Sequence, residues 1–285
     1  MPKTFSAPPA NEQLETIACP LCGSSAWRHF LACEGFGFVR CRECATVFQN
    51  PRPVFDDVRR RYGEWYFSYE LENERNFFGL MKLGLADIGF RERTAGFGNG
   101  SGVPRAFLDI GCATGMLIEQ MQAEGWAVRG VDVCRESAEY GRSHRGVDIF
   151  PGTLEEAGLQ DESFGVVHFS HLIEHVPDPR AFLAEVWRIL APGGFAVITT
   201  PNIDGFQARL FGKEWRSAIA DHLVLFSRVT LERLVGESGF DRRQTVTWGG
   251  LAVGTAPTFV KRPVDRLAKR LGFGDVVMVL AAKRR

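Results

Sequence analysis

The chain has 285 residues, which is enough for one large domain and a small accessory domain. Its 34 Lys and Arg residues equal its 34 Asp and Glu residues in number, so no overall positive field favours nucleic acid. The sequence has neither an apolar run of about 18 residues nor a signal-peptide pattern, which argues against a membrane span and predicts a cytoplasmic location. In such a protein, cysteines are expected to be metal ligands or thiols rather than disulfides.

The N-terminal part contains five of the seven cysteines, and four of them form two pairs. Residues 1–15 hold prolines and polar residues without periodicity and are predicted to form a disordered leader. Cys19-Pro-Leu-Cys22 and Cys41-Arg-Glu-Cys44 are two Cys-x2-Cys pairs, separated by 18 residues. Two such pairs complete a tetrahedral zinc site, so residues 16–50 are predicted to form a zinc ribbon rather than to carry four unrelated thiols. The Zn²⁺ is expected to be structural, because four thiolates leave no open coordination position.

Residues 51–103 are predicted to link the ribbon to the main domain. A short helix is expected over 52–61, and a second over 72–93, where apolar residues recur at helical spacing. Between them, Tyr62-Gly-Glu-Trp-Tyr-Phe-Ser-Tyr69 is densely aromatic. Aromatic side chains supply large contact area at little entropy cost, so this cluster forms either a core patch or a lid over a ligand.

The main domain, residues 104–285, opens on a strand, a glycine turn and a helix. Ala106 to Ile110 is a buried strand by its composition, Gly111 to Gly115 a turn of small residues, and Met116 begins a helix. This arrangement lets backbone N–H groups and a helix N-terminus approach a ligand closely. Asp132 ends a second apolar run, where a carboxylate can accept both hydroxyls of a ribose. A carboxylate inside the first strand, Asp109, is costly unless it has a partner.

These residues resemble the first motif of the class I S-adenosylmethionine-dependent methyltransferases, Asp-x-Gly-x-Gly-x-Gly. Asp109, Gly111 and Gly115 match the motif, whereas Ala113 replaces its middle glycine. The resemblance implies a Rossmann-like sheet of seven strands with the last strand antiparallel, and S-adenosyl-L-methionine as cofactor. It further implies that Gly111 approaches the methionine and ribose of the cofactor, that Asp109 orients the turn, and that Asp132 binds the ribose. A dinucleotide fold is the competitor, but its motif has no Asp two positions before the first glycine.

The third predicted strand, 146–150, is followed by Thr153 and Leu154, which in the resembled family would face the adenine; Thr153 can equally cap a helix. The family also implies that the aromatic segment covers the cofactor, which makes Tyr66 and Tyr69 further candidates. The predicted cofactor-binding residues are Asp109, Gly111, Cys112, Ala113, Gly115, Asp132, Val133, Thr153, Leu154, Ser170 and His171.

The fourth predicted strand, 163–169, leads into Ser170-His-Leu-Ile-Glu-His-Val-Pro-Asp-Pro179. This stretch is similar to the Glu-His-Val-x-Asp-Pro signature of the ubiquinone-type O-methyltransferases and their small-molecule relatives. It lies where ligands bind in open α/β sheets, and a histidine there could take a proton from a substrate hydroxyl. His171 and His175 are therefore predicted to be catalytic, although either could instead fix a loop through a hydrogen bond. Glu174 and His175 alone are too few to define a metal site.

The remaining elements complete the family pattern. A helix over 180–190 is followed by Leu-Ala-Pro-Gly-Gly and a strand over 195–200. A cap over 203–222 is expected to shape the substrate pocket, and His222-Leu-Val-Leu-Phe-Ser227 matches a segment that follows such caps in the resembled subgroup. His222, with Asp221, thus competes with His171 and His175 for the catalytic role. A helix over 230–239 and strands over 243–248 and 275–282 follow, and basic residues at 261–270 are a solvated helix face or a contact for an anionic substrate.

Taken together, the sequence predicts a methyltransferase acting on a small molecule, with O-methylation favoured by the Glu-His-Val likeness. The acceptor oxygen would attack the cofactor methyl group in line while the protein aligns the reactants. One alternative is an RNA methyltransferase whose ribbon holds the nucleic acid. Another is a non-catalytic methyltransferase-like module that binds a partner through its ribbon. The sequence leaves the role of the ribbon and the oligomeric state open.

Overall fold

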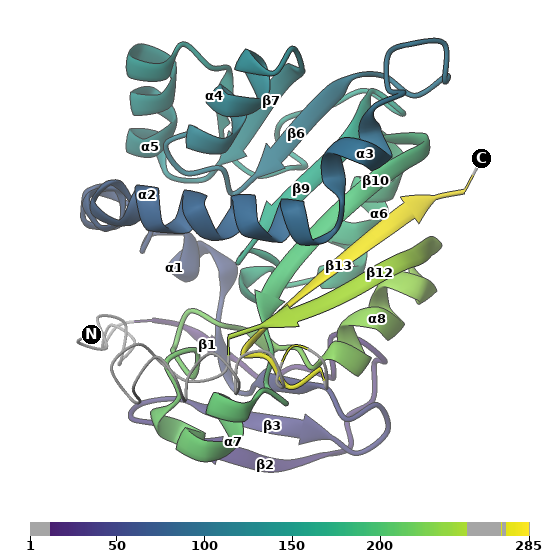
Figure 1. Ribbon diagram of the computed structural model, residues 1–285. Helices are drawn as coiled ribbons and strands as arrows, with labels where there is room; N and C mark the ends of the chain where they lie inside the picture. Colours follow the sequence, from purple (N-terminus) through teal and green to yellow (C-terminus); the bar gives the residue numbers. More distant parts are fainter. Residues whose placement is uncertain (1–11, 250–268, 270–271, 285) are drawn as a thin grey trace, which may run out of the picture.

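A computed structural model describes residues 12–249, 269 and 272–284 (Figure 1). The predicted leader as far as residue 11, and most of the basic stretch 261–270, lie outside the described residues. Lys269 is described, and its Nζ lies 2.6 Å from Oδ2 of Asp87, as in a surface ion pair.

The centre of the molecule is a seven-stranded sheet in the order β12-β13-β10-β9-β6-β7-β8. The five strands β10, β9, β6, β7 and β8 are parallel to one another. Strand β13 runs antiparallel to both β10 and β12. The bounds are β6 Ala106–Ile110, β7 Ala127–Asp132, β8 Ile149–Pro151, β9 Phe164–Ser170, β10 Leu190–Pro201, β12 Phe240–Trp248 and β13 Val276–Lys283. The predicted fold class is thereby confirmed.

Helices connect the parallel strands, and their starts follow from local sequence. They are α4 Met116–Ala123, α5 Arg135–Tyr140 with a π-turn Gly141–Arg145, α6 Pro179–Ile189 and α8 Arg228–Glu237. Asp178 caps α6 by accepting hydrogen bonds from the N–H groups of Arg180 and Ala181, both at 3.0 Å. The Pro-Gly-Gly segment after α6, expected to end the helix, lies instead in the irregular start of β10, where the register against β9 shifts.

A long helix, α2 (Glu64–Asp87), crosses the sheet (Figure 1). The aromatic segment therefore belongs to the helix, which begins eight residues before the predicted start at 72. The helix ends at Asp87, and Gly89, with φ of 62°, begins a separate short helix, α3 Phe90–Thr94. Towards its end α2 lies close to β13 and β12, since a Cβ on Gly84 would stand 2.5 Å from the Met278 side chain.

The helix predicted over 52–61 is also shorter than expected. It forms only over Phe55–Arg59, as α1. Ahead of it, β5 (Arg52–Pro53) pairs with β1 (Leu14–Glu15) instead of continuing the helix.

The N-terminal part forms a second sheet, in the order β11-β4-β3-β2 (lower part of Figure 1). Its strands are β2 Trp27–Ala32, β3 Gly37–Cys41, β4 Val47–Gln49 and β11 Val224–Leu225. The first two lie between the two cysteine pairs or end on the second pair, whereas β11 comes from the segment that follows the predicted cap. Buried residues of both parts, such as Phe48 and Phe226, belong to one continuous core.

The predicted cap, 203–222, contains the short helix α7 (Phe206–Phe211) and a 3₁₀ turn, Gly212–Glu214. Trp215 is fully buried and anchors this segment, whereas the large side chains of α7 are partly exposed. The cap attaches through Trp215 and through the buried side of α7, which includes Ala208.

Candidate active site

A cavity of about 1220 Å³ lies at the carboxyl ends of β6, β7, β9 and β10, and α2 forms one of its walls. The residues that line it fall into two groups. The turn end is formed by residues 109–113, 131–133 and 152–156, and the histidine end by His171, His175, Arg216, Ser217 and His222. Every residue predicted to bind the cofactor or to act in catalysis lines this cavity except Gly115. Gly115 lies behind the turn, where a Cβ would stand 2.9 Å from the side chains of Val147 and Ile149.

Backbone geometry defines the turn end. Gly111, Ala113 and Gly115 all have positive φ, at 69°, 47° and 81°. Glycine adopts this region at no cost, whereas Ala113 adopts it against its intrinsic preference. The N–H of Ala113 compensates by donating to Oδ2 of Asp132 at 2.7 Å. The turn is therefore fixed by the carboxylate at the end of the neighbouring strand.

Asp132 is the second component of the turn end. Its Oδ1 accepts a hydrogen bond from the N–H of Cys134 at 2.8 Å, so both carboxylate oxygens have backbone donors. Burial raises the pKa of Asp132 to about 6, against the lowering effect of those two bonds. Glu70 of α2 lines the same cavity, and burial together with the charge of Asp132 raises its pKa to about 7. The turn end thus gathers carboxylates that suit a cationic ligand.

Asp109 has the partner that its position in a buried strand requires. Its Oδ1 lies 2.6 Å from Nδ1 of His168, which stands directly opposite in the ladder between β6 and β9. Both side chains are buried, and Nε2 of His168 has no hydrogen-bond partner among the described residues. Because a carboxylate accepts, Nδ1 donates and sets the orientation of Asp109. The sequence signalled that Asp109 needed a partner, but not that the partner was His168.

His171 opens the histidine end, directly after β9. Its φ of 54° is unusual for a residue other than glycine, and its N–H donates to the carbonyl of Thr199 at 2.9 Å. Nδ1 lies 3.3 Å from Oε1 of Glu174, and 44% of the imidazole side chain is exposed. Glu174 is fully buried, which alone would raise its pKa, but the neighbouring histidines, His171 first, hold the pKa at about 2. Oε1 of Glu174 has no hydrogen-bond partner among the described residues, so the carboxylate and the imidazole form a close charge pair rather than a hydrogen bond.

His175 and His222 are held differently. Nδ1 of His175 lies 2.9 Å from the carbonyl of Asp221, and Nδ1 of His222 lies 2.7 Å from the carbonyl of Ser217. Since a carbonyl only accepts, both Nδ1 atoms carry a proton. Burial, with the charge of His175, lowers the pKa of His222 to about 3. Ligand atoms of Glu174, His175 and His222 lie within 4.8 Å of one another, so this group could hold a metal ion.

The histidine end is bonded to the ribbon sheet. The N–H of Leu223 donates to the carbonyl of Glu174, and the carbonyl of Leu223 accepts from the N–H of Gln49, both at 2.8 Å. One residue thus joins β4 of the ribbon to the Glu-His segment. The neighbouring residues Val224 and Leu225 extend that join as strand β11.

The aromatic segment at the start of α2 lines the cavity. The rings of Tyr62 and Tyr66 meet edge to face at 4.8 Å between centroids, and Trp65 stacks on Tyr69 at 5.9 Å. The hydroxyl of Tyr62 also lies 3.2 Å from Nδ1 of His175. The predicted lid residues Tyr66 and Tyr69 therefore stand beside both ends of the site.

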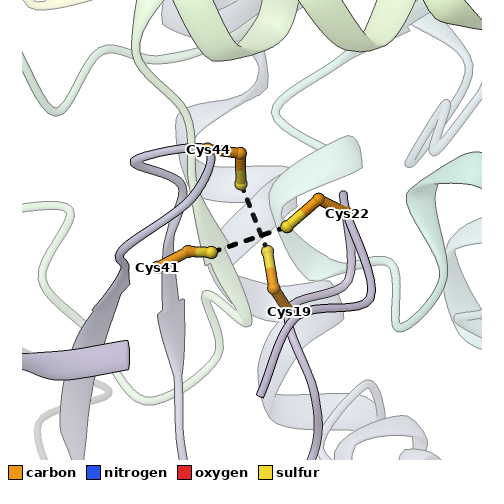
Figure 2. A group of neighbouring side chains, drawn as sticks. All are labelled: Cys19, Cys22, Cys41 and Cys44. Atoms are coloured by element: carbon orange, nitrogen blue, oxygen red, sulfur yellow. Dashed lines mark hydrogen bonds between the residues drawn. The ribbon is translucent and has the colours of Figure 1, made fainter. Parts of the chain in front are cut away.

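The four ribbon cysteines converge on one point (Figure 2). The sulfur atoms of Cys19 and Cys44 are 3.4 Å apart, those of Cys22 and Cys41 are 3.5 Å apart, and all four lie within 4.8 Å of one another. These separations exceed a disulfide bond of about 2.05 Å but suit four thiolates around one Zn²⁺ with Zn–S bonds of about 2.3 Å. The cluster is compatible with the predicted zinc.

Among the described residues, none of the helices combines the length and the apolar content that crossing a bilayer requires.

Comparison with known proteins matches residues 88–245 to a family model described as a methyltransferase domain. A ubiquinone biosynthesis O-methyltransferase from Vibrio atlanticus is 34% identical over 178 residues, covering 58% of this chain and 69% of that protein. One from Klebsiella pneumoniae is 32% identical over 159 residues, covering 53% of this chain and 60% of that protein.

Solved structures share the fold. A Thermotoga maritima S-adenosylmethionine-dependent methyltransferase, described as a possible histamine N-methyltransferase, has a TM-score of 0.51 and 26% identity, covering 63% of this chain and 82% of that one. One from Archaeoglobus fulgidus has a TM-score of 0.52 and 22% identity, covering 77% and 100%. The chain therefore belongs to the class I S-adenosylmethionine-dependent methyltransferases.

Proposed function

We propose that the protein transfers the methyl group of S-adenosyl-L-methionine to a hydroxyl oxygen of a small molecule, with His171 as the general base. The observation that carries the proposal is the His171–Glu174 pair, which lines the cavity beside the glycine turn. The names of the two bacterial relatives, both O-methyltransferases, support the choice of an oxygen acceptor.

The turn end would hold the cofactor. Asp132 would accept the ribose hydroxyls, the backbone of Gly111 and Ala113 would approach the methionine part, and Thr153 and Leu154 would border the adenine. The carboxylates of this end suit the positive charges of the ligand. When bound, the cofactor supplies an electrophilic methyl group on its sulfonium sulfur.

The histidine end would activate the acceptor. Glu174, whose Oε1 lies 3.3 Å from Nδ1 of His171, would favour a proton on Nδ1 and leave Nε2 to face the acceptor hydroxyl. As the acceptor oxygen forms a bond to the methyl carbon, the carbon–sulfur bond breaks and its electron pair stays on sulfur. The hydroxyl proton passes to Nε2 of His171. His175 and His222 are less suited to this role because both are more enclosed and are fixed by backbone carbonyls.

Two features support a small acceptor. The aromatic side chains of α2 form a wall of the cavity, so the space beside the histidines is bounded on that side. The equal numbers of acidic and basic residues provide no overall field for RNA. The ribbon would then brace the histidine end through Leu223 rather than hold nucleic acid.

The proposal is tested by incubating the protein and S-adenosylmethionine with matched acceptors, catechol, aniline and a short RNA, and identifying the products by mass spectrometry. We expect O-methylation of catechol, reduced about 100-fold or more in His171→Gln, as is typical for loss of a general base. His144→Gln is the control, because His144 lies outside this cavity. Transfer to aniline or RNA in place of catechol, or full activity of His171→Gln, would overturn it.

A further inference from the structure

The charged residues of the cavity single out one arginine. Among its described lining residues, the arginines are Arg59 and Arg216 and no lysine is present. Arg59 is engaged by Glu156, to whose carboxylate oxygens its two Nη atoms donate at 2.8 and 3.0 Å. Arg216 stands at the histidine end, next to Ser217, whose carbonyl holds His222.

A buried carboxylate fixes Arg216. Nε of Arg216 donates to Oδ2 of Asp275 at 2.9 Å, and Nε1 of Trp215 donates to Oδ1 of Asp275 at 2.8 Å. The Asp275 side chain is 1% exposed. Its backbone is equally constrained, since its N–H donates to the carbonyl of Gly249 at 2.7 Å and its carbonyl accepts from Asn202 at 2.8 Å. The Nε of the Arg216 guanidinium is therefore held by a carboxylate that is itself fixed in position.

The bond at Nε has a geometric consequence. A guanidinium carries five N–H groups in a planar fork, and its end, formed by the two Nη atoms, matches the two oxygens of a carboxylate or phosphate. Among the described residues, the recorded hydrogen bonds of Arg216 use Nε. The side chain lines the cavity and is 60% exposed, although its anchor is buried.

The surrounding charges permit an anion at this place. Glu174 accepts a hydrogen bond from Thr200 and lies 3.3 Å from His171, and Asp221 is paired with Arg61. Asp109 and Asp132 belong to the turn end. Tyr69 lies near enough for the charge of Arg216 to oppose the rise that burial causes in its pKa. The carboxylates of the histidine end are thus already compensated.

We propose that Arg216 binds an anionic group, a carboxylate or a phosphate, of the acceptor, so that the substrates of this enzyme are small hydroxylated acids or phosphate esters. This inference rests on the proposed function, because only methyl transfer makes the bound anion part of an acceptor. The anion site itself can be tested without methyl transfer. Arg216 would align the molecule so that its hydroxyl reaches His171.

The first experiment titrates benzoate and inorganic phosphate separately into protein loaded with S-adenosylhomocysteine, by calorimetry. We expect one of the two anions to bind, with affinity lowered at least tenfold in Arg216→Gln and retained in part in Arg216→Lys. Trp215→Phe is the control, because it removes the other bond to Asp275 and keeps the guanidinium. Equal anion binding by wild type and Arg216→Gln, or a loss as large in Trp215→Phe, would overturn the inference. The anion that binds decides between carboxylate and phosphate.

The second experiment compares methyl transfer to 3,4-dihydroxybenzoate and to catechol, which differ by one carboxylate. If benzoate binds, wild type is expected to prefer the acid at least tenfold in kcat/KM, and Arg216→Gln is expected to lose that preference mainly through KM. Preference for the acid that survives in Arg216→Gln would contradict the inference. Arg216-dependent anion binding without O-methylation of any hydroxylated acceptor would instead sink the proposed function and leave the anion site standing.

Discussion

At the turn end of the cavity the contacts come from the backbone of one strand–turn–helix unit and from the carboxylates beside it. At the histidine end they come from side chains of separate segments: the aromatic part of α2, the Glu-His stretch after β9, and the cap. The first kind of surface varies little with sequence, because a backbone N–H is the same in every residue. The second kind changes with every substitution, so we expect cofactor binding to be general and acceptor choice to be specific to this chain.

The largest expected effect comes from the zinc cluster, because the ribbon sheet supports the histidine end through Leu223. Cys44→Ser should release the metal and lower the free energy of unfolding by roughly 5 kcal/mol or more, since apparent zinc-binding energies of small structural sites are about 10–16 kcal/mol. Metal content by mass spectrometry and thermal unfolding measure this. Cys33→Ser is the control, since Cys33 lies outside the cluster. Unchanged stability, or wild-type protein without metal, would refute the zinc assignment.

Asp132→Asn should weaken cofactor binding at the turn end and leave the histidine end unchanged. We expect the Kd for S-adenosylhomocysteine to rise about 10- to 100-fold, or about 1.4–2.7 kcal/mol, with kcat at saturating cofactor changed little. Asp148→Asn, at an exposed site outside the cavity, should bind normally.

The raised pKa of Asp132, about 6, also gives binding a pH dependence. Below that pH the protein must lose a proton to accept both ribose hydroxyls, so affinity should fall up to tenfold per pH unit in wild type and less steeply in Asp132→Asn, where Glu70 still titrates. Calorimetry at pH 5 to 8 measures both. Parallel profiles of the two proteins would contradict a role for this carboxylate.

His168 lies behind the glycine turn, and its replacement tests whether it orients Asp109. If its Nδ1–H orients Asp109, then His168→Leu should raise the KM for S-adenosylmethionine about three- to tenfold, whereas His168→Asn, which keeps a donor, should recover most of that loss. Both variants leave packing defects, so stability alone cannot tell them apart. Steady-state kinetics separates them, and equal KM values for the two variants would assign His168 a packing role.

A separate pH effect concerns the stability of the fold and comes from His222. Its pKa of about 3 in the folded protein lies below the unfolded value of about 6.5, so the unfolded chain binds more protons in between. Stability should therefore fall as the pH drops through this window, by at most about 1.4 kcal/mol per pH unit. Urea unfolding at pH 4 to 7 gives the free energy of unfolding at each pH. This free energy should change less with pH in His222→Gln than in wild type. A stronger pH dependence in His222→Gln than in wild type would mean that His222 is protonated in the folded protein.

The two ends also differ in how far the sequence predicts them. The glycine turn and Asp132 belong to consecutive elements of one short stretch, and these elements are also neighbours in space. A local sequence pattern was therefore enough to place them beside one cavity. The pairing of His168 with Asp109, and the anchoring of Arg216 by Asp275, join residues 59 positions apart. No periodicity encodes such contacts. Strand β11 was missed for the same reason, since two residues gain strand geometry from pairing with β4. The binding and catalytic roles of these residues stay predictions.

The most direct test of the account is the single-turnover rate of methyl transfer to 3,4-dihydroxybenzoate as a function of pH, in wild type and His171→Gln. We expect the variant to be about 100-fold slower than wild type and the two pH profiles to differ, because a general base contributes only in its unprotonated form. Both rates are compared at saturating S-adenosylmethionine, because His171 is also among the residues predicted to border the cofactor. Equal rates and equal pH profiles of the two proteins would contradict the account.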